Sequence, residues 1–566
     1  MNRLRRTFTL LAAAGFVALA VLVSAGPKPQ APRDIDRNVI VRFKPPLSQA
    51  LHQRVSQHGG KLYRELALIN SAAYTISQAG LESLLVTGVV ETVSEDHRNI
   101  KATLDYTSSA VYATQANGAG FTGKGITVAV VDSGITTHPD LNDSTNATRI
   151  KHTQIFRSET TGEDIYGHGT HVAGMIGGRA TQSTGSQYTR SFRGIAPDVQ
   201  FVNLTALDRD GNASDSTVIA AVQAAVQLKS DKGIRILNLS LGRPVYQSYR
   251  TDPLCQAVEA AWKAGIVVVV AAGNDGRNNA FGTEGYGTIT APGNDPYVIT
   301  VGAVKTMQTS SRGDDVLTTY SSKGPTSIDH VVKPDIVAPG NRIVSAMAGG
   351  GRLRNQYVSN NVQLSYYVTG GINQAGDQYY QMSGTSMAAG VVSGAVAIML
   401  EKDPSLTPDQ VKARLMKTAS KSFPLYTTTV DQGITYTTRS DIFSVGSGYL
   451  DLNAALANSD KATKPALSPI ATYAAGTGQA TLKTKVGGVS AVWGTGAVWG
   501  TSAVWGTNVI GNTSAVWGTG AIWGSSAVWG TSAVWGTGAI WGTSAVWGTS
   551  TAVQTENDQL LIAGEN

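Results

Sequence analysis

The sequence predicts an α/β protein whose main unit is a doubly wound, mostly parallel sheet. A small α+β unit precedes this sheet, and a repetitive, β-rich tail follows it. Three observations carry this prediction: apolar segments alternate with helical patterns between residues 105 and 458, shorter strand and helix patterns lie before them, and a tryptophan hexapeptide recurs after them. Strands with so few polar residues are typically buried on both faces, as in a parallel sheet covered by helices.

The main unit contains five apolar strand patterns, each followed by turn residues or a helical pattern. The predicted strands are 128–131, 200–204, 234–239, 266–271 and 297–301, and the predicted helices are 170–176, 217–229, 254–263, 385–400 and 408–419. The preceding unit shows strands at 39–43, 69–76 and 89–93 and a helix at 81–85. These periodicities separate strand from helix along both units.

The start of the chain has the features of a secretory signal peptide. Arg3, Arg5 and Arg6 precede an apolar stretch at 10–23, and small residues follow at Ser24 and Ala25. We expect cleavage after Ala25 and export of the protein. The alternative is an uncleaved anchor, but the stretch is shorter than the roughly 20 residues that span a bilayer.

Charge and cysteine content exclude several classes of function. The net charge of +6 is small for 566 residues, and no basic run is interleaved with aromatic residues, so nucleic acid is not an expected partner. The single cysteine, Cys255, cannot form an intrachain disulfide and is expected to be a buried thiol.

Four short motifs carry the groups that hydrolysis of a peptide bond by a hydroxyl requires. Asp132 ends a buried strand, where α/β folds place their sites. His168 stands between two glycines at the start of a helix, and Ser386 opens the long helix at 385–400, near free N–H groups. Asn274 follows the strand 266–271 and can donate to an oxyanion together with the Ser386 N–H.

These motifs resemble those of the subtilisin-like serine proteases, peptidase family S8. The motifs are Asp132-Ser133-Gly134, His168-Gly169-Thr170-His171, Ala271-Ala272-Gly273-Asn274 and Gly384-Thr385-Ser386-Met387-Ala388, in the family's order. The resemblance implies a broad-specificity serine endopeptidase in which Ser386 attacks, His168 transfers the proton and Asp132 orients His168. It also implies that no cofactor takes part in the chemistry, and we expect His171 to be structural because the triad needs one imidazole.

The resemblance also implies where substrate and calcium bind. Ser240, Leu241 and Gly242 would pair with extended substrate, Gly211 would form the opposite rim, and Ala291, Pro292 and Gly293 would form a pocket wall. Asp140 matches a calcium ligand of the family, but the segment 177–194 contains arginines instead of the expected oxygen ligands. A second departure is an insertion at 348–380, whose length is typical of a lid or a mobile segment.

The resemblance divides the chain as follows: signal peptide 1–25, propeptide 26–104 with an inhibitor-I9-like core at 37–98, catalytic domain 105–458, linker 459–485, hexapeptide repeats 486–551 and acidic C-terminal tail 552–566. The propeptide is expected to assist folding, to block the cleft as an intramolecular inhibitor and to be removed by self-cleavage between 99 and 107. The alternative is an ordinary α+β module. The mature protein is expected to be a monomer.

The tail repeats Ala-Val-Trp-Gly-Thr-Ser, and nine of the ten tryptophans recur there at six-residue spacing, with one skipped register at Gly511. An even spacing keeps all rings on one face of an extended chain. We expect a β-solenoid or hairpin array that buries them. Two alternatives stay open: an exposed ladder that binds polysaccharide or the cell surface, and a removable secretion segment.

Two other functions remain to be distinguished from the protease. One is a surface-binding protein whose repeats do the work; the four filled catalytic positions argue against it. The other is the acid-active relative of this fold with a glutamate base, which lacks the histidine at this position and has aspartate where Asn274 stands.

Overall fold

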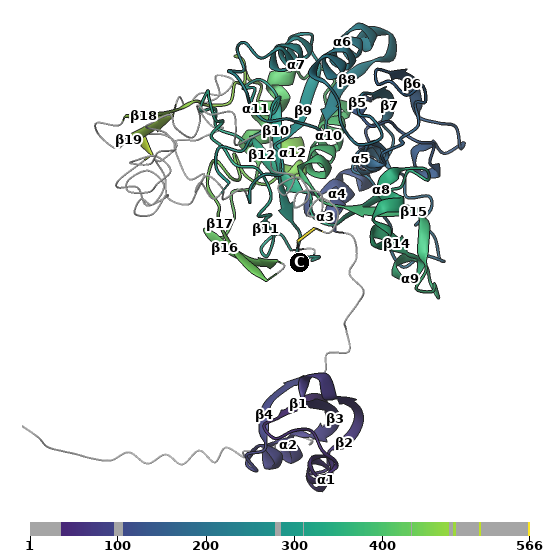
Figure 1. Ribbon diagram of the computed structural model, residues 1–566, viewed down its shortest axis with the longest axis vertical. Helices are drawn as coiled ribbons and strands as arrows, with labels where there is room; N and C mark the ends of the chain where they lie inside the picture. The colour runs from purple at the N-terminus through teal and green to yellow at the C-terminus, as the bar shows by residue number, and fades with distance from the viewer. Residues whose placement is uncertain are drawn as a thin grey trace, which may run out of the picture. The chain divides into compact units, whose positions relative to one another are not determined.

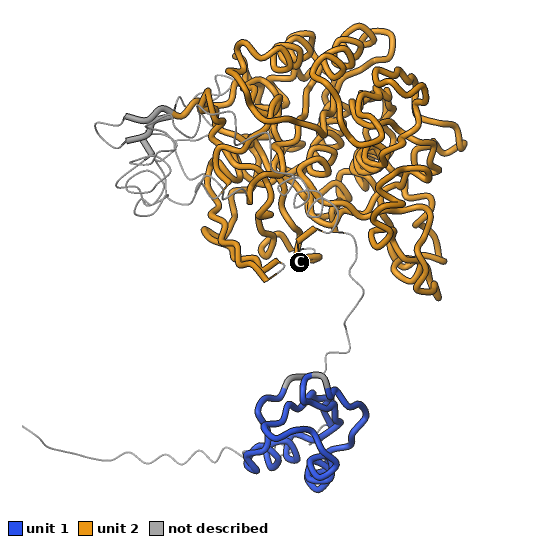
Figure 2. Tube along the Cα trace, in the orientation of Figure 1, with its two compact units in different colours: residues 1–102 blue, residues 103–566 orange. Residues whose placement is uncertain are grey.

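The computed structural model describes residues 36–95, 106–277, 285–309, 311–431, 433–474, 479–482, 509–510 and 564–565. The chain divides into two compact units, residues 1–102 and 103–566 (Figure 2). The predicted signal peptide and all of the repeats except 509–510 lie outside the described residues. Within the described ranges, no helix is both long and apolar enough to cross a membrane.

Unit 1 is a four-stranded antiparallel sheet with two helices. Its elements are β1 (Asp36–Phe43), α1 (Gln49–Gln57), β2 (Lys61–Leu66), η1 (Ala67–Ile69), β3 (Ser71–Ser77), α2 (Gln78–Leu85) and β4 (Val90–Glu95), in the sheet order β2-β3-β1-β4. Along β1, Val39, Val41 and Phe43 are buried, so their alternation places one face of the strand in the core.

The sequence analysis did not predict two elements of unit 1. Strand β2 is exposed at nearly every position, so it shows no apolar alternation. Helix α1 buries only Leu51 and Val55, which is too narrow a stripe to stand out from a polar segment.

The main sheet of unit 2 has eight strands, and the pairs are parallel except for β10 with β11. The strands are β5 (Thr127–Asp132), β6 (Ile150–Ile155), β7 (Gln200–Thr205), β8 (Ile234–Leu239), β9 (Val267–Ala271), β10 (Ile299–Lys305), β11 (Val316–Leu317) and β12 (Ile336–Pro339). Their order is β11-β10-β9-β8-β5-β7-β6, and β12 also pairs with β10. From β5 the chain first adds strands on one side of the sheet and then, from β8 onward, on the other side. Open α/β sheets bind ligands at such a point of reversal, which here lies between β5 and β8.

Helices cover both faces of this sheet, as Figure 1 shows. Helix α5 (His168–Gly177) packs on α10 (Thr385–Lys402), which lies over β8, β9, β10 and β12. Helices α6 (Asp215–Lys232) and α7 (Pro253–Lys263) pack on β8 and β9, respectively, and α11 (Pro408–Thr418) also contacts β9. The predicted doubly wound arrangement is confirmed.

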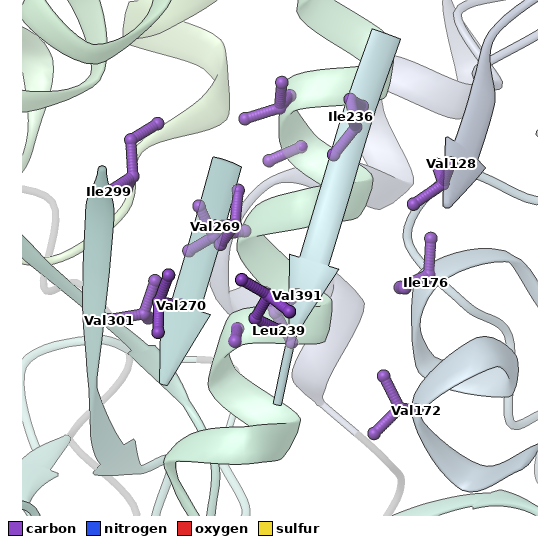
Figure 3. Close-up of a cluster of buried hydrophobic side chains, with 14 of the residues drawn as sticks. Val128, Val172, Ile176, Ile236, Leu239, Val269, Val270, Ile299, Val301 and Val391 are labelled. Atoms are coloured by element: carbon purple, nitrogen blue, oxygen red, sulfur yellow. The ribbon is translucent and has the colours of Figure 1, made fainter. Parts of the chain in front are cut away.

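Helix α10 runs through the middle of the core. Every residue from Thr385 to Leu400 is buried, which explains why this helix is apolar or small all around. Figure 3 shows Val391 of α10 beside Leu239 of β8, and Val270 of β9 beside Val301 of β10. The start of α10 is thereby held at a defined place beside the ends of these strands.

The insertion at 348–380 folds into helices and strands, and the expectation that it acts as a lid or mobile segment stays a prediction. It contains α8 (Arg352–Gln356), η3 (Val358–Asn360), β14 (Asn361–Gln363), α9 (Leu364–Tyr367) and most of β15 (Ala375–Met382), which pairs with β13 (Ile343–Ala346). Tyr367 and Tyr379 are buried with Phe192, which comes from the other unusual segment, 177–194. The two departures from the family pattern therefore form one hydrophobic cluster, and their aromatic side chains account for the order.

The remaining elements are α3 (Thr107–Ala110), α4 (Ala113–Gly118), η2 (Pro139–Leu141), the hairpin β16 (Tyr426–Asp431) and β17 (Ile434–Arg439), α12 (Leu452–Ala457), β18 (Ala471–Ala474), β19 (Gln479–Leu482) and β20 (Val509–Ile510). Strand β20 lies at the skipped register of the repeats and pairs antiparallel with β19. The predicted β-solenoid or hairpin array of the other repeats lies outside the described residues.

Candidate active site

Asp132, at the end of strand β5, forms a hydrogen-bonded pair with His168, the first residue of α5. His168 Nδ1 lies 2.8 Å from Asp132 Oδ1, and the Asp132 side chain has no exposed surface. Burial alone would lower the pKa of His168, but the charge and hydrogen bond of Asp132 outweigh it and raise this pKa above its ordinary value of 6.5. The carboxylate therefore orients the ring and favours its protonated form.

A second carboxylate, Asp164, shapes the loop that presents His168. Asp164 is buried and accepts hydrogen bonds from the Gly167 N–H at 2.6 Å, the Thr170 N–H at 2.8 Å and the Ser133 hydroxyl at 2.8 Å. It thus satisfies N–H groups at the start of α5. Sequence reasoning missed Asp164, although an acidic residue shortly before a helix is a recognisable capping signal.

Ser386 lies in the first turn of α10 and is 8% exposed. Its hydroxyl donates to the Ser240 carbonyl at 3.2 Å, and the Ser240 hydroxyl donates to the Ser386 carbonyl at 2.8 Å. Asn238 Nδ2 donates to the Ser240 hydroxyl, and Ser393 donates to Asn238 Oδ1. This buried chain of hydrogen bonds ties the start of α10 to the end of β8, and the sequence analysis did not foresee it.

Asn274 lies opposite Ser386 and has a fixed amide orientation. Its Oδ1 accepts the Thr385 N–H at 2.9 Å and the Thr385 hydroxyl at 3.2 Å. With Oδ1 occupied, Nδ2 is the group that can donate toward an oxyanion in the cleft. Gly384 precedes this turn with a φ of 148°, a conformation that glycine adopts without steric cost.

Several of the predicted site residues line one cleft of about 430 Å³. Its lining includes His168, Asn274 and Ser386, together with the predicted substrate residues Gly211, Ser240, Leu241 and Gly242. The predicted wall is placed differently: Thr290 lines the cleft, whereas Ala291, Pro292 and Gly293 are buried and are not among its lining residues. The backbone of Ala291 pairs with that of Arg243, which itself lines the cleft.

His171 does not belong to this cleft lining. It is fully buried, and its Nε2 lies 3.1 Å from the Ile343 carbonyl and 3.0 Å from the Tyr380 carbonyl. Burial and the neighbouring His168 lower the pKa of His171 to about 3. His171 is therefore neutral and ties α5 to the β13–β15 sheet, as its predicted structural role requires.

Asp140 is surrounded by hydrogen-bond donors, which does not fit a calcium ligand. Its Oδ1 accepts from the Thr181 hydroxyl and the Gln182 N–H, and its Oδ2 accepts from the Tyr379 hydroxyl at 2.7 Å. The Arg149 guanidinium also binds the Asp140 carbonyl. Calcium needs oxygen ligands rather than N–H and O–H donors. In the part of the chain described, no group of three or more His, Cys, Asp or Glu residues could hold a metal ion.

We predict that Tyr379→Phe destabilises the protein by roughly 1–3 kcal/mol, because it leaves a buried carboxylate oxygen of Asp140 without its donor. Thermal unfolding should show the same loss in EDTA and in excess calcium. The control is Tyr246→Phe, since Tyr246 is 66% exposed and its loss of a hydroxyl should change little. A much larger loss in EDTA than in calcium would instead place a metal ion at Asp140.

The comparison with known proteins decides the family. The model described as "Subtilase family" matches residues 123–446, a range that contains Asp132, His168, Asn274 and Ser386. The chain belongs to the subtilase family. It is 37% identical to serine protease AprX of Bacillus subtilis (strain 168) over 368 residues, which cover 64% of this chain and 76% of that protein. It is 30% identical to subtilisin E of the same organism over 393 residues, or 68% of this chain and 86% of subtilisin E.

Among solved structures, the subtilase resembles a cold-adapted subtilisin-like serine proteinase, with 28% identity and a TM-score of 0.37 over 53% of this chain and 84% of that chain. The family and its relatives establish that this subtilase is a serine endopeptidase and acts on protein substrates.

Proposed function

We propose that Ser386, His168 and Asp132 form the catalytic triad of this subtilase, and that Asn274 and the Ser386 N–H form its oxyanion hole. The observation that carries the proposal is the 2.8 Å contact of His168 Nδ1 with the buried Asp132, at the edge of a cleft that Ser386 and Asn274 also line. The contact leaves the other ring nitrogen of His168 to act as a base.

The reaction follows from this arrangement. Ser386 Oγ attacks the peptide carbonyl carbon while His168 Nε2 takes its proton, and the carbonyl oxygen becomes an oxyanion that Asn274 Nδ2 and the Ser386 N–H stabilise. The tetrahedral intermediate collapses to an acyl-enzyme as His168 gives the proton to the leaving amine. Water, activated by the same imidazole, then releases the acid and regenerates Ser386. The chemistry needs no cofactor.

The proposed specificity is broad. Substrate lies extended between the segment 240–242 and the rim at Gly211, where recognition by backbone pairing adds affinity with little preference for side chains. The rim continues through small residues, Asn212, Ala213 and Ser214, and the carboxylate of Asp215 is neutralised by Arg243 at 2.8 Å. At this rim the charge of Asp215 is thereby offset, which leaves backbone pairing as the main contact with substrate.

We further propose that the protein is exported as a precursor and activates itself. Supporting observations are the signal-peptide features at 1–25 and a unit 1 with its own hydrophobic core ahead of the catalytic unit. Unit 1 then acts as the inhibitory propeptide, the cut falls between residues 99 and 107, and the mature enzyme acts as a monomer. The repeats at 486–551 either stack on one another or bind the cell surface or polysaccharide.

The test is labelling with a fluorophosphonate, which reacts with an activated serine and mimics the oxyanion. Wild-type enzyme should carry the label on the peptide that contains Ser386. In Asn274→Ala, both the labelling rate and kcat for a peptide amide should fall by about 10² to 10³, the size that removing this donor has within the subtilisin family, while KM changes little.

The control is Asn360→Ala, because Asn360 is distant in sequence from these motifs and does not line the cleft. It should label at the wild-type rate. Label on another serine, or an Asn274→Ala enzyme that keeps full kcat, would contradict the proposed site.

A further inference from the structure

A segment that follows the repeats in sequence lies buried in unit 2. Glu565 is 1% exposed, and its Oε1 accepts from the Thr319 N–H at 2.6 Å and from Arg277 Nη2 at 3.0 Å. Lys305 Nζ lies 3.7 Å from the other carboxylate oxygen. Asn341 binds both polar backbone groups of Glu565: its Nδ2 donates to the Glu565 carbonyl at 3.0 Å, and its Oδ1 accepts a hydrogen bond from the Glu565 N–H at 2.9 Å. Side chain and backbone are therefore both recognised.

The residue before Glu565 lies in a position that favours glycine. Gly564 has a φ of 68°, and a Cβ added there would lie 2.4 Å from Ser383 Oγ and 2.7 Å from Arg342 Cγ. Real Cβ atoms do not approach other atoms so closely, and the left-handed conformation disfavours other residues. The site thus selects a glycine followed by a carboxylate.

The charges around the site call for an acidic ligand. Arg277 and Lys305 are 8% and 7% exposed, and Arg277 already pairs with Asp431 of the β16–β17 hairpin at 2.8 Å. Lys305 also donates to the Thr429 hydroxyl at 3.1 Å. Among the described residues, Glu565 supplies the second carboxylate of this network, and removing one partner of a buried ion pair is costly.

The site adjoins both segments of the proposed oxyanion hole. Arg277 follows Asn274 by three residues, and Ser383, which Gly564 contacts, precedes Ser386 by three. Thr385 already links the two segments through its hydrogen bond to Asn274. A ligand held by one segment and packed against the other restrains both.

We propose that Arg277, Lys305, Thr319 and Asn341 form a carboxylate-binding site on the catalytic unit, whose ligand is the chain's own Gly564–Glu565 segment. Docking of this segment stabilises the unit and restrains the two segments that carry Asn274 and Ser386. The tail is thereby attached to the protease at its far end as well as through the linker.

Two variants test the binding site in the full chain with Ser386→Ala, which removes self-digestion. Glu565→Gln removes the charge of the ligand, and Gly564→Ala adds a Cβ where the site has no room for one. Each should lower the melting temperature by about 5 °C, because each removes the Glu565 carboxylate from its buried partners. Asp231→Asn makes a matched change from carboxylate to amide at a side chain that is 69% exposed, and it should leave the melting temperature unchanged. Melting temperatures of Glu565→Gln and Gly564→Ala equal to that of the parent would overturn the site.

A rescue experiment tests the ligand itself. A synthetic peptide with the sequence of residues 557–566, added at millimolar concentration, should raise the melting temperature of the Glu565→Gln chain. The same peptide with glutamine at the Glu565 position should not. Equal rescue by both peptides would show that the carboxylate is not recognised.

The effect on the active site is measured separately in the enzyme that retains Ser386. The Glu565→Gln enzyme should lose roughly 2- to 30-fold in kcat for a short peptide substrate, while Asp231→Asn keeps its kcat. A lowered melting temperature with unchanged kcat would retain the binding site and overturn the restraint on catalysis. Because the unfolding experiments use an inactive chain, their outcome does not depend on the proposed triad.

Discussion

Replacement of Ser386 by alanine should lower kcat/KM for a peptide substrate by about 10⁶, the effect that loss of the nucleophile has within the subtilisin family itself. The reason is that alanine lacks the hydroxyl on which, in the proposed reaction, the acyl-enzyme intermediate forms. Hydrolysis of casein should fall to the background rate. The precursor should also stay intact by gel and mass spectrometry, whereas wild-type protein sheds residues up to a cut between 99 and 107.

The matched control is Ser359→Ala, an exposed serine on η3, which should mature and digest casein like the wild type. The mutant Ser386→Ala should unfold at a temperature close to that of the parent chain with intact propeptide, since the hydroxyl makes only one long hydrogen bond. Maturation of the Ser386→Ala protein in the absence of any added protease would refute self-cleavage.

The second large effect is expected for Asp132→Asn, which should lower kcat at pH 7 by about 10⁴. An amide in place of the carboxylate retains the shape but no longer favours the tautomer in which His168 Nδ1 carries its proton. It also removes the charge that raises the pKa of His168. The rate of hydrolysis against pH measures both effects.

The sign of the pH shift is set by the base role of His168. Only neutral imidazole accepts the proton of Ser386, so activity is lost as the pH falls through the pKa of His168. In the wild type that pKa lies above 6.5, and in Asp132→Asn the acid limb should move to lower pH. Asp231→Asn, in a carboxylate that is 69% exposed, should leave the profile unchanged. A profile of Asp132→Asn with the wild-type acid limb would contradict this account.

The parts of this protein that could be predicted from sequence are those with short-range signals. Strands such as 267–271 are continuous apolar runs, and the residues of the site follow strand or helix boundaries that glycines mark. These patterns depend only on neighbours in the chain. The doubly wound sheet and the positions of Asp132, His168 and Ser386 could therefore be predicted from the sequence. Strand β6 was missed because its residues are only partly buried at the sheet edge.

The rest depends on contacts between distant segments. The packing of Phe192 against Tyr367 and Tyr379 joins two segments that each appear to be an irregular loop in the sequence. The same is true of Asp140, whose family role suggested calcium until its donors, including Tyr379, were located. The buried position of Glu565 has no local signal either, because its partners Arg277 and Asn341 are more than two hundred residues away. Only three-dimensional structure brings such groups together.

The docked Glu565 also bears on how the repeat array can change in evolution. For a chain segment held at both ends, the entropic cost of closure rises only with the logarithm of its length, by about 0.6 kcal/mol for each doubling. Gain or loss of one hexapeptide is therefore almost neutral for docking, whereas substitution of Gly564 or Glu565 is not. Selection can act on repeat number for the tail's own task while the attachment point at the catalytic unit stays the same.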